Sequence, residues 1–185
     1  MITSSSSVSI DMNEFTAKRV LVTGGTKGVG KATADRFQRG GATVTITARS
    51  APTEKTDSHF IQADASTAEG TTKVINEILN RFQGIDIIIH NVGGTSAPSG
   101  GFITVTDEIW QQSLNENLFP AVRLDRGLLP SMIQRGSGVI IHISSIQRTM
   151  PLYDSTLAYA AAKAARSPTT ARACRTRSVP KEFAS

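Results

Sequence analysis

The sequence predicts an α/β fold in which helices cover both faces of a doubly wound parallel sheet, giving three layers. Two observations support this prediction. From residue 19 onward, short β-branched and aliphatic runs alternate with longer stretches of helical periodicity, and these stretches are long enough to cross over between parallel strands. The chain has 185 residues, of which 39% are hydrophobic, which suits one domain with a substantial core.

Each element follows from its local pattern. Aliphatic and β-branched runs predict strands at residues 19–23, 42–48, 59–63, 85–90 and 138–144. Helical periodicity predicts helices over about residues 28–39, after residue 66, over about 107–134, and from about residue 155. Ser66 and Glu69 have the spacing of a capping box that opens the second helix. Pro120 is expected to kink or interrupt the third helix.

The composition argues against several classes of function. The net charge of +5 comes mostly from the C-terminal residues, where aromatic residues do not alternate with the cations, so nucleic acid is not an expected partner. No apolar run has the length of a membrane span, and residues 1–14 lack the features of a secretory signal and are expected to be a disordered lead-in. The single cysteine, Cys174, excludes an internal disulfide and suits a cytoplasmic protein.

A glycine-rich segment, TGGTKGVG, lies between the first predicted strand and the first predicted helix. Glycine lacks the Cβ atom that would keep a pyrophosphate away from the backbone, and the helix N-terminus offers unpaired N–H groups. Ligands of such sheets bind beyond the carboxyl ends of the strands. The segment therefore predicts a dinucleotide phosphate site, and a plain tight turn is the alternative.

Further motifs follow in order: HNVGG ends the fourth predicted strand, and YAAAK lies in the last predicted helix. Together with the spacing of Gly24, Gly28 and Gly30, they resemble the short-chain dehydrogenase/reductase family. The resemblance covers about residues 18–165. It implies an incomplete NAD(P)-binding Rossmann domain over residues 15–165, without the family's last strands. The cofactor-binding positions that it implies are Gly24, Thr26, Lys27, Gly28, Val29, Gly30, Arg49, Asp64, Ala65, Asn91, Gly93, Tyr159 and Lys163.

The match departs from the family in the HNVGG segment, where His90 and Val92 replace the first Asn and the Ala of the family's Asn-Asn-Ala-Gly pattern. Asn91 is the matching position. The resemblance assigns Asp64 to the adenine ring, and an isolated acidic residue at a strand end would otherwise be a solvated carboxylate.

The resemblance implies four catalytic residues and no metal site. Tyr159 and Lys163 lie at i and i+4, so they share one face of a helix. A phenol has a pKa of about 10, and a nearby ammonium favours the phenolate that acid–base catalysis requires. Lys163 would also hold the nicotinamide ribose. Ser145, preferred to Ser144, would polarise the substrate carbonyl, and Asn117 would distort its helix and hold a water of the proton relay.

The charges near the second predicted strand bear on the choice of cofactor. An acidic residue at the end of that strand binds the ribose 2′-hydroxyl of NAD, whereas the 2′-phosphate of NADP requires a cation. Here the strand ends in Ala48 and Arg49, and Lys27 adds a second cation in the glycine turn. We therefore expect NADP(H) to be preferred over NAD(H).

The family pattern stops after Ala165. Residues 166–185 lack helical apolar periodicity, include Pro168, and are expected to be a disordered basic tail. Suitable codons read in another frame can spell LTNYSKGLSNEVGPKGVRV, which would continue a family member, so we hypothesise a one-nucleotide insertion near codon 166. The fifth strand would then be an apolar edge, and Lys163 would lie in a fraying helix.

These observations predict an NADP(H)-dependent oxidoreductase that interconverts a small-molecule carbonyl and alcohol by hydride transfer. A catalytically inactive nucleotide-binding fragment is the alternative. A methyltransferase would share the glycine-rich turn but gives no reason for Ser145, Tyr159 and Lys163 in this order. Family members form dimers or tetramers partly through the helix that carries YxxxK, and the tail leaves this assembly open.

Overall fold

The computed structural model describes residues 11–166. Its core is a five-stranded parallel sheet with the order β3-β2-β1-β4-β5. The order reverses between β1 and β4, which lie side by side in the middle of the sheet, as the predicted doubly wound fold requires. The strands are β1 (Arg19–Thr23), β2 (Thr43–Ala48), β3 (His59–Gln62), β4 (Ile87–His90) and β5 (Val139–His142).

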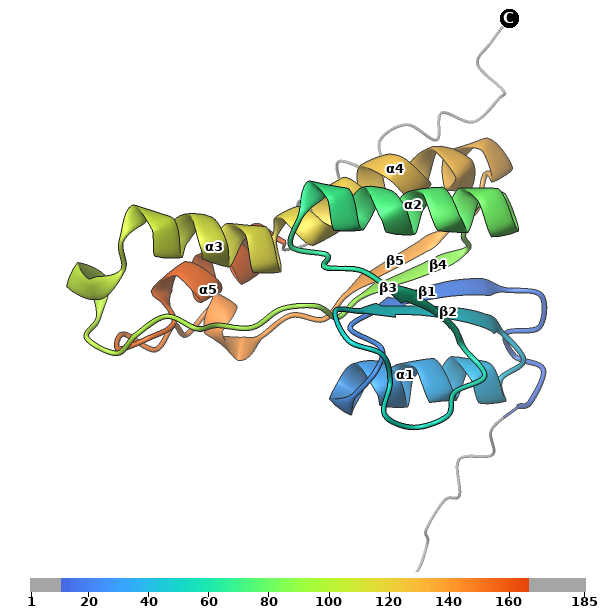
Figure 1. The fold of residues 1–185 in the computed structure, drawn as a ribbon, viewed down its shortest axis with the longest axis horizontal. Coiled ribbons are helices and arrows are strands. Elements are labelled where there is room, and N and C mark those ends of the chain that lie inside the picture. The colour runs from blue at the N-terminus through green and yellow to red at the C-terminus, as the bar shows by residue number, and fades with distance from the viewer. Residues whose placement is uncertain (1–10, 167–185) are drawn as a thin grey trace, which may run out of the picture.

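Helices cover both faces of this sheet, which confirms the three-layer prediction (Figure 1). One face packs on α1, and the other packs on α2 and α4. In Figure 1, α3 and α5 lie beyond the end of the sheet where β4 and β5 finish, and they pack on each other. The helices are α1 (Gly28–Arg39), α2 (Ala68–Phe82), α3 (Asp107–Asn117), α4 (Phe119–Arg135) and α5 (Leu157–Ala165), with short 3-10 turns η1 (Phe102–Thr104) and η2 (Ile146–Arg148).

Two helix boundaries differ from the sequence prediction. The stretch expected to be one helix over 107–134 is divided at Leu118, between α3 and α4, and Pro120 lies in the first turn of α4. Proline fits there because the first turn of a helix has no intrahelical partner for its N–H groups. The predicted capping box was wrong by one residue: Thr67, not Ser66, caps α2, and its Oγ1 accepts a hydrogen bond from the N–H of Gly70 at 3.0 Å.

Two edges of the domain bear on the remaining predictions. Residues 12–17 form a turn in which Glu14 pairs with Arg36 and the Phe15 ring lies 4.6 Å from the Phe37 ring, and the predicted lead-in over residues 1–14 overlaps the start of this turn. Residues 1–10 lie outside the described range. At the opposite edge, β5 has one strand neighbour among residues 11–166, and its Val139 and Ile141 are 49% and 42% exposed.

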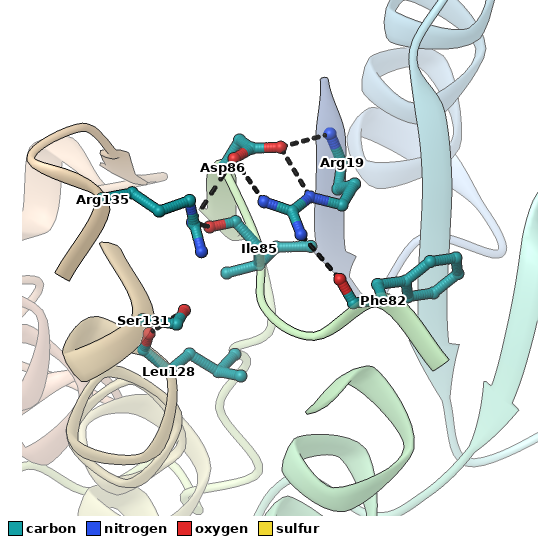
Figure 2. Close-up of polar contacts among 7 residues, drawn as sticks. All are labelled: Arg19, Phe82, Ile85, Asp86, Leu128, Ser131 and Arg135. Atoms are coloured by element: carbon teal, nitrogen blue, oxygen red, sulfur yellow. Dashed lines mark hydrogen bonds and ion pairs between the residues drawn. The ribbon is translucent and has the colours of Figure 1, made fainter. Parts of the chain in front are cut away.

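The start of the sheet is held by an ion-pair network at the amino ends of β1 and β4 (Figure 2). Arg19 binds both oxygens of Asp86, at 2.8 and 2.7 Å, and also donates to the backbone oxygen of Phe82 at 2.6 Å. Arg135, at the end of α4, adds a second cation 3.3 Å from Asp86. The hydrogen bond from Arg19 lowers the pKa of Asp86 to about 2, although burial opposes ionisation. This network joins β1, β4 and α4 away from the predicted site.

None of the helices within residues 11–166 is both long and apolar enough to cross a membrane.

Candidate active site

The glycine turn lies at the carboxyl end of β1, where the sequence placed it. A Cβ on Gly30 would come within 2.1 Å of the backbone oxygen of Gly24, so this close crossing requires glycine. Gly28 opens α1 with φ +55°, and a Cβ there would meet nothing within 4 Å, so the space beside this position is open. Lys27 precedes α1 without a side-chain cap, and the first turn of α1 holds no acidic residue. The N–H groups of this turn therefore suit an anion.

Asn91 connects this turn to the end of β4. Its side-chain amide donates to the backbone oxygens of Thr23 at 3.1 Å and Gly24 at 3.2 Å. Thr23 Oγ1 in turn accepts from the backbone N–H groups of Asn91 and Val92, at 3.0 and 3.1 Å. The structure therefore brings together two segments that the sequence proposed as parts of one site.

The charged residues proposed for cofactor binding lie in the glycine turn before α1 and at the ends of β2 and β3. Lys27 and Arg49 are exposed, and Arg49 follows the last residue of β2 directly. Asp64 accepts hydrogen bonds from the backbone N–H and the hydroxyl of Ser66, at 2.9 and 2.7 Å. Burial opposes its ionisation, but these bonds and the charge of Arg49 hold the pKa of Asp64 below its ordinary value. A negative Asp64 thus lies near Arg49. Of the neighbouring predicted positions, Thr26 is half-buried, Val29 exposed and Ala65 buried.

Tyr159 and Lys163 lie on α5, as predicted. The Lys163 ammonium is 5.5 Å from the centre of the half-buried Tyr159 ring and donates to the backbone oxygen of Ile143 at 3.3 Å. It also borders Gly93, where a Cβ would come within 2.6 Å of Nζ. Lys163, which the sequence analysis placed in a fraying helix end, is only 4% exposed and lies within α5 in the structure. Burial, followed by the charge of Arg166, lowers the pKa of Lys163 to about 8.

Ser145 lies at the start of η2, which packs against α5. Its hydroxyl accepts a hydrogen bond from the backbone N–H of Gln147 at 3.2 Å, and the residue is half-buried. Ser144 is exposed. The hydroxyl of Ser145 can still donate its proton, because its oxygen is the acceptor in the bond to Gln147.

Asn117 is fully buried at the end of α3, where the helix breaks. Its side chain accepts from Gly94 N and donates to Gly94 O, both at 2.9 Å, and it also donates to Ser113 O at 2.9 Å. Asn117 therefore joins the long helical stretch to the loop that follows β4.

A buried cluster of charged and titratable residues lies beside Lys163, and the sequence analysis did not identify it. Arg166, assigned to the tail, is only 6% exposed. The rings of His90 and His142 stack with centres 4.8 Å apart, and His90 lies 2.6 Å from Asp125. Burial, and then the charges of His90 and Arg166, lower the pKa of His142 to about 4, so His142 is neutral near pH 7. The replacement of the family's asparagine by His90 was the one signal of this cluster in the sequence.

Comparison with known proteins decides the family. The family model for the short chain dehydrogenase matches residues 18–176. The chain belongs to the short-chain dehydrogenase family. The match continues past Ala165, where the sequence analysis ended the resemblance.

Among curated relatives of this dehydrogenase, the uncharacterized oxidoreductase YvrD of Bacillus subtilis is 35% identical over 144 residues, covering 73% of this chain and 54% of the relative. The 3-oxoacyl-[acyl-carrier-protein] reductase FabG of Vibrio harveyi is 32% identical over 157 residues, covering 80% of this chain and 62% of the relative. The chain thus spans about half to two thirds of the length of these curated relatives.

Solved structures share the fold. L-sorbose reductase from Gluconobacter frateurii, in complex with NADPH and L-sorbose, superposes with a TM-score of 0.77 at 33% identity, covering 88% of this chain and 66% of that chain. The NADH-dependent reductase A1-R' in complex with NAD gives a TM-score of 0.76 at 25% identity, covering 84% and 70%. These neighbours use different nicotinamide cofactors.

Proposed function

We propose that this dehydrogenase chain carries the cofactor site and the acid–base residues of an NADP(H)-dependent oxidoreductase that interconverts a carbonyl and an alcohol. The observation that carries the proposal is the position of Lys163, whose buried ammonium lies 5.5 Å from the Tyr159 ring centre and beside the loop after β4. Two charged or ionisable groups on one helix face, next to the end of a central strand, are suited to proton transfer.

The residues around the glycine turn fit a dinucleotide. The uncapped first turn of α1 and the open space at Gly28 would accept the pyrophosphate, and Asn91 holds the end of β4 against this turn. The nicotinamide ribose would lie between the loop at Gly93 and the ammonium of Lys163. Asp64 and Ala65 would border the adenine. When bound, the cofactor supplies or accepts the hydride.

A preference for NADP(H) is the finer part of the proposal. Lys27 and Arg49 are exposed cations beside the turn and the end of β2, and the strand ends without the carboxylate that would favour NAD. Arg49 is partly balanced by Asp64. A 2′-phosphate would add two negative charges within reach of both cations, and a guanidinium binds such a group with paired hydrogen bonds.

The chain's own residues have distinct tasks in carbonyl reduction. The Tyr159 phenol would donate its proton to the carbonyl oxygen as the hydride arrives at carbon, and Lys163 would stabilise the resulting phenolate. Ser145 would donate a hydrogen bond to the same oxygen. Asn117 would take the place in the proton relay that the family resemblance gives it, with its backbone oxygen accepting a hydrogen bond from Arg166.

Turnover tests this proposal directly. NADPH consumption with a panel of small ketones and aldehydes should be measurable for the 185-residue chain, and Tyr159→Phe should lower it by about 100-fold or more, since general acid catalysis contributes on that order. Tyr153→Phe is the matched control, because Tyr153 is an exposed tyrosine that precedes α5 and is not one of the proposed catalytic residues. Near-full activity of Tyr159→Phe would contradict the mechanism.

A catalytically inactive nucleotide-binding fragment is the second candidate. It is favoured by Arg166, whose guanidinium occupies the backbone oxygen of Asn117, the residue assigned to the proton relay. Saturable cofactor binding by the 185-residue chain, without turnover of any carbonyl in the panel, would identify this function.

We also propose that the protein is cytoplasmic. Its sequence has one cysteine and so cannot form an internal disulfide, which suits a reducing compartment. Cell fractionation checks this. A membrane or secreted fraction that holds most of the chain would contradict it.

A further inference from the structure

Arg166 makes contacts that are unusual for a residue in an exposed basic tail. Its Nη1 donates to the backbone oxygens of Asn117 at 2.9 Å and Val92 at 3.3 Å, and its Nη2 donates to the backbone oxygen of His90 at 3.0 Å. Nη2 also lies 3.3 Å from Nδ1 of His142. One guanidinium therefore joins the residue that follows α5 to the ends of β4, α3 and β5.

The oxygen of Asn117 lacks its usual helical donor, whereas the oxygen of His90 also accepts a hydrogen bond from the N–H of Ile143 at 2.9 Å. The oxygen of Asn117 would bond to the N–H of Ala121 in a continuous helix, but the break at Leu118 gives that N–H to the oxygen of Leu118 at 3.2 Å. A buried carbonyl without a partner costs about 1–3 kcal/mol. The planar fork of arginine can satisfy several such oxygens at once, which an ammonium cannot do with the same geometry.

Arg166 also lies beside the predicted catalytic lysine. Lys163 and Arg166 are three residues apart at the end of α5, a spacing that places both on one helix face. They are 4% and 6% exposed, so two positive side chains share one buried region. Water screens such a pair weakly, and the like charge therefore disfavours the ammonium form of Lys163.

We propose that Arg166 is a positioning residue for Lys163: it fixes α5 against the ends of β4, α3 and β5, and its charge disfavours the ammonium form of the lysine. The inference rests on the proposed function only where it treats Lys163 as a catalytic residue. The contact itself follows from the described geometry.

Other ionisable groups near Lys163 and Arg166 also affect how Lys163 titrates with pH. The loop after β4 contributes Gly93 and no charge. Tyr159 lies on α5 itself, and His142 is neutral near pH 7 for the reasons given above. The groups that face Lys163 and Arg166 are Tyr159 on α5, His90 on β4, His142 on β5 and Asp125 on α4. Of these, Asp125 attracts Arg166, while the charge of Arg166 repels that of Lys163.

Direct titration of Lys163 tests the proposal without cofactor or substrate. The chain is labelled with ¹³C-lysine, the Cε–Hε signal of Lys163 is assigned by its loss in Lys163→Arg, and its midpoint is followed by NMR from pH 6 to pH 11. Arg166→Gln removes the charge and keeps an amide donor. Arg166→Lys keeps the charge without the fork. Arg148→Gln removes an exposed arginine of η2, which packs on the same helix, and is the matched control.

The wild-type midpoint is expected near pH 8. Arg166→Gln should raise it by about half a unit or more, because a nearby like charge is removed, while Arg166→Lys and Arg148→Gln should leave it close to wild type. A folded Arg166→Gln chain with an unchanged midpoint would overturn the proposal. If circular dichroism shows that Arg166→Gln does not fold, the test depends on Arg166→Lys. A folded Arg166→Lys chain in which Lys163 titrates at the ordinary lysine midpoint would then overturn the proposal. Loss of folding in both variants would assign Arg166 a purely structural role and would also contradict it.

Discussion

Asn117 and Gly94 exchange two hydrogen bonds: the side chain of Asn117 accepts from the backbone N–H of Gly94 at 2.9 Å and donates to its backbone oxygen at 2.9 Å. This reciprocal pair holds the loop after β4 against the break between α3 and α4. The neighbouring Gly93 thereby passes under the ammonium of Lys163. Three segments that are distant in sequence are fixed together at the candidate site.

Gly93→Ala should disturb this arrangement, whereas Gly94→Ala should not. A Cβ on Gly93 would lie 2.6 Å from Nζ of Lys163 and 2.7 Å from Oδ1 of Asn117, while one on Gly94 would meet nothing within 4 Å. We expect Gly93→Ala to lower the free energy of unfolding by about 1–3 kcal/mol, as overpacking does, and Gly94→Ala to change it by less than about 0.5 kcal/mol. Urea unfolding measures both. Equal effects of the two substitutions would show that the loop is loosely packed.

Lys163→Met should stabilise the fold while removing the proposed function. The pKa of Lys163 is depressed in the folded chain, so the cost of burying its charge is present below about pH 8 and is relieved as the pH rises toward the ordinary lysine value. At pH 7 we expect a gain of about 1–3 kcal/mol in the free energy of unfolding, and little gain near pH 10. Lys18→Met, at an exposed lysine, is the control. Destabilisation by Lys163→Met at pH 7 would contradict this account of the buried ammonium.

Acid should weaken the network in Figure 2. The pKa of Asp86 is about 2 in the folded chain and about 3.9 in an unfolded chain, so its stabilisation is present above about pH 4 and is lost as the pH falls toward 2. Asp86→Asn should therefore cost about 1–2 kcal/mol at pH 6, allowing for solvent screening at this partly exposed site. The cost should shrink near pH 2.5. Urea unfolding of Asp86→Asn at both pH values, beside exposed Asp57→Asn, checks this prediction. A cost that does not change with pH would contradict it.

The outer edge of β5 should promote self-association. Val139 and Ile141 pair with Ile87 and Ile89 of β4 in register, so they continue an apolar face of the sheet, yet they are 49% and 42% exposed. Ile141→Lys should reduce the concentration-dependent association seen by sedimentation velocity. Ile103→Lys changes an apolar residue that is 91% exposed but lies in η1, away from the sheet. An equal reduction by both variants would attribute association to general surface hydrophobicity.

The order of strands and helices was predictable because each element has its own periodicity and the crossovers are of ordinary length. Periodicity does not locate a helix break that depends on side-chain contacts with another loop, so the sequence left a kink and an interruption near Pro120 as alternatives, and the structure divides the stretch at Leu118. Likewise, Ser66 and Thr67 are equivalent caps in sequence, and the backbone conformation of Thr67 decides between them.

The candidate site was predictable where residues act within one element or one motif, as with Tyr159 and Lys163 on a single helix. Arg166 could not be predicted in this way. Its burial depends on carbonyl oxygens from three other elements, and the apolar pattern that normally signals burial is absent around it.

Fluorescence titration of the 185-residue chain with NADPH and, separately, with NADH tests the central claim most directly. We expect saturable binding that favours NADPH by about 10-fold or more, and a reduced preference in Arg49→Ala, because one cation near the 2′-phosphate is lost. Arg39→Ala, at the exposed arginine that ends α1, should keep the preference. Absence of binding to both cofactors, or tighter binding of NADH, would contradict the proposed NADP(H) site.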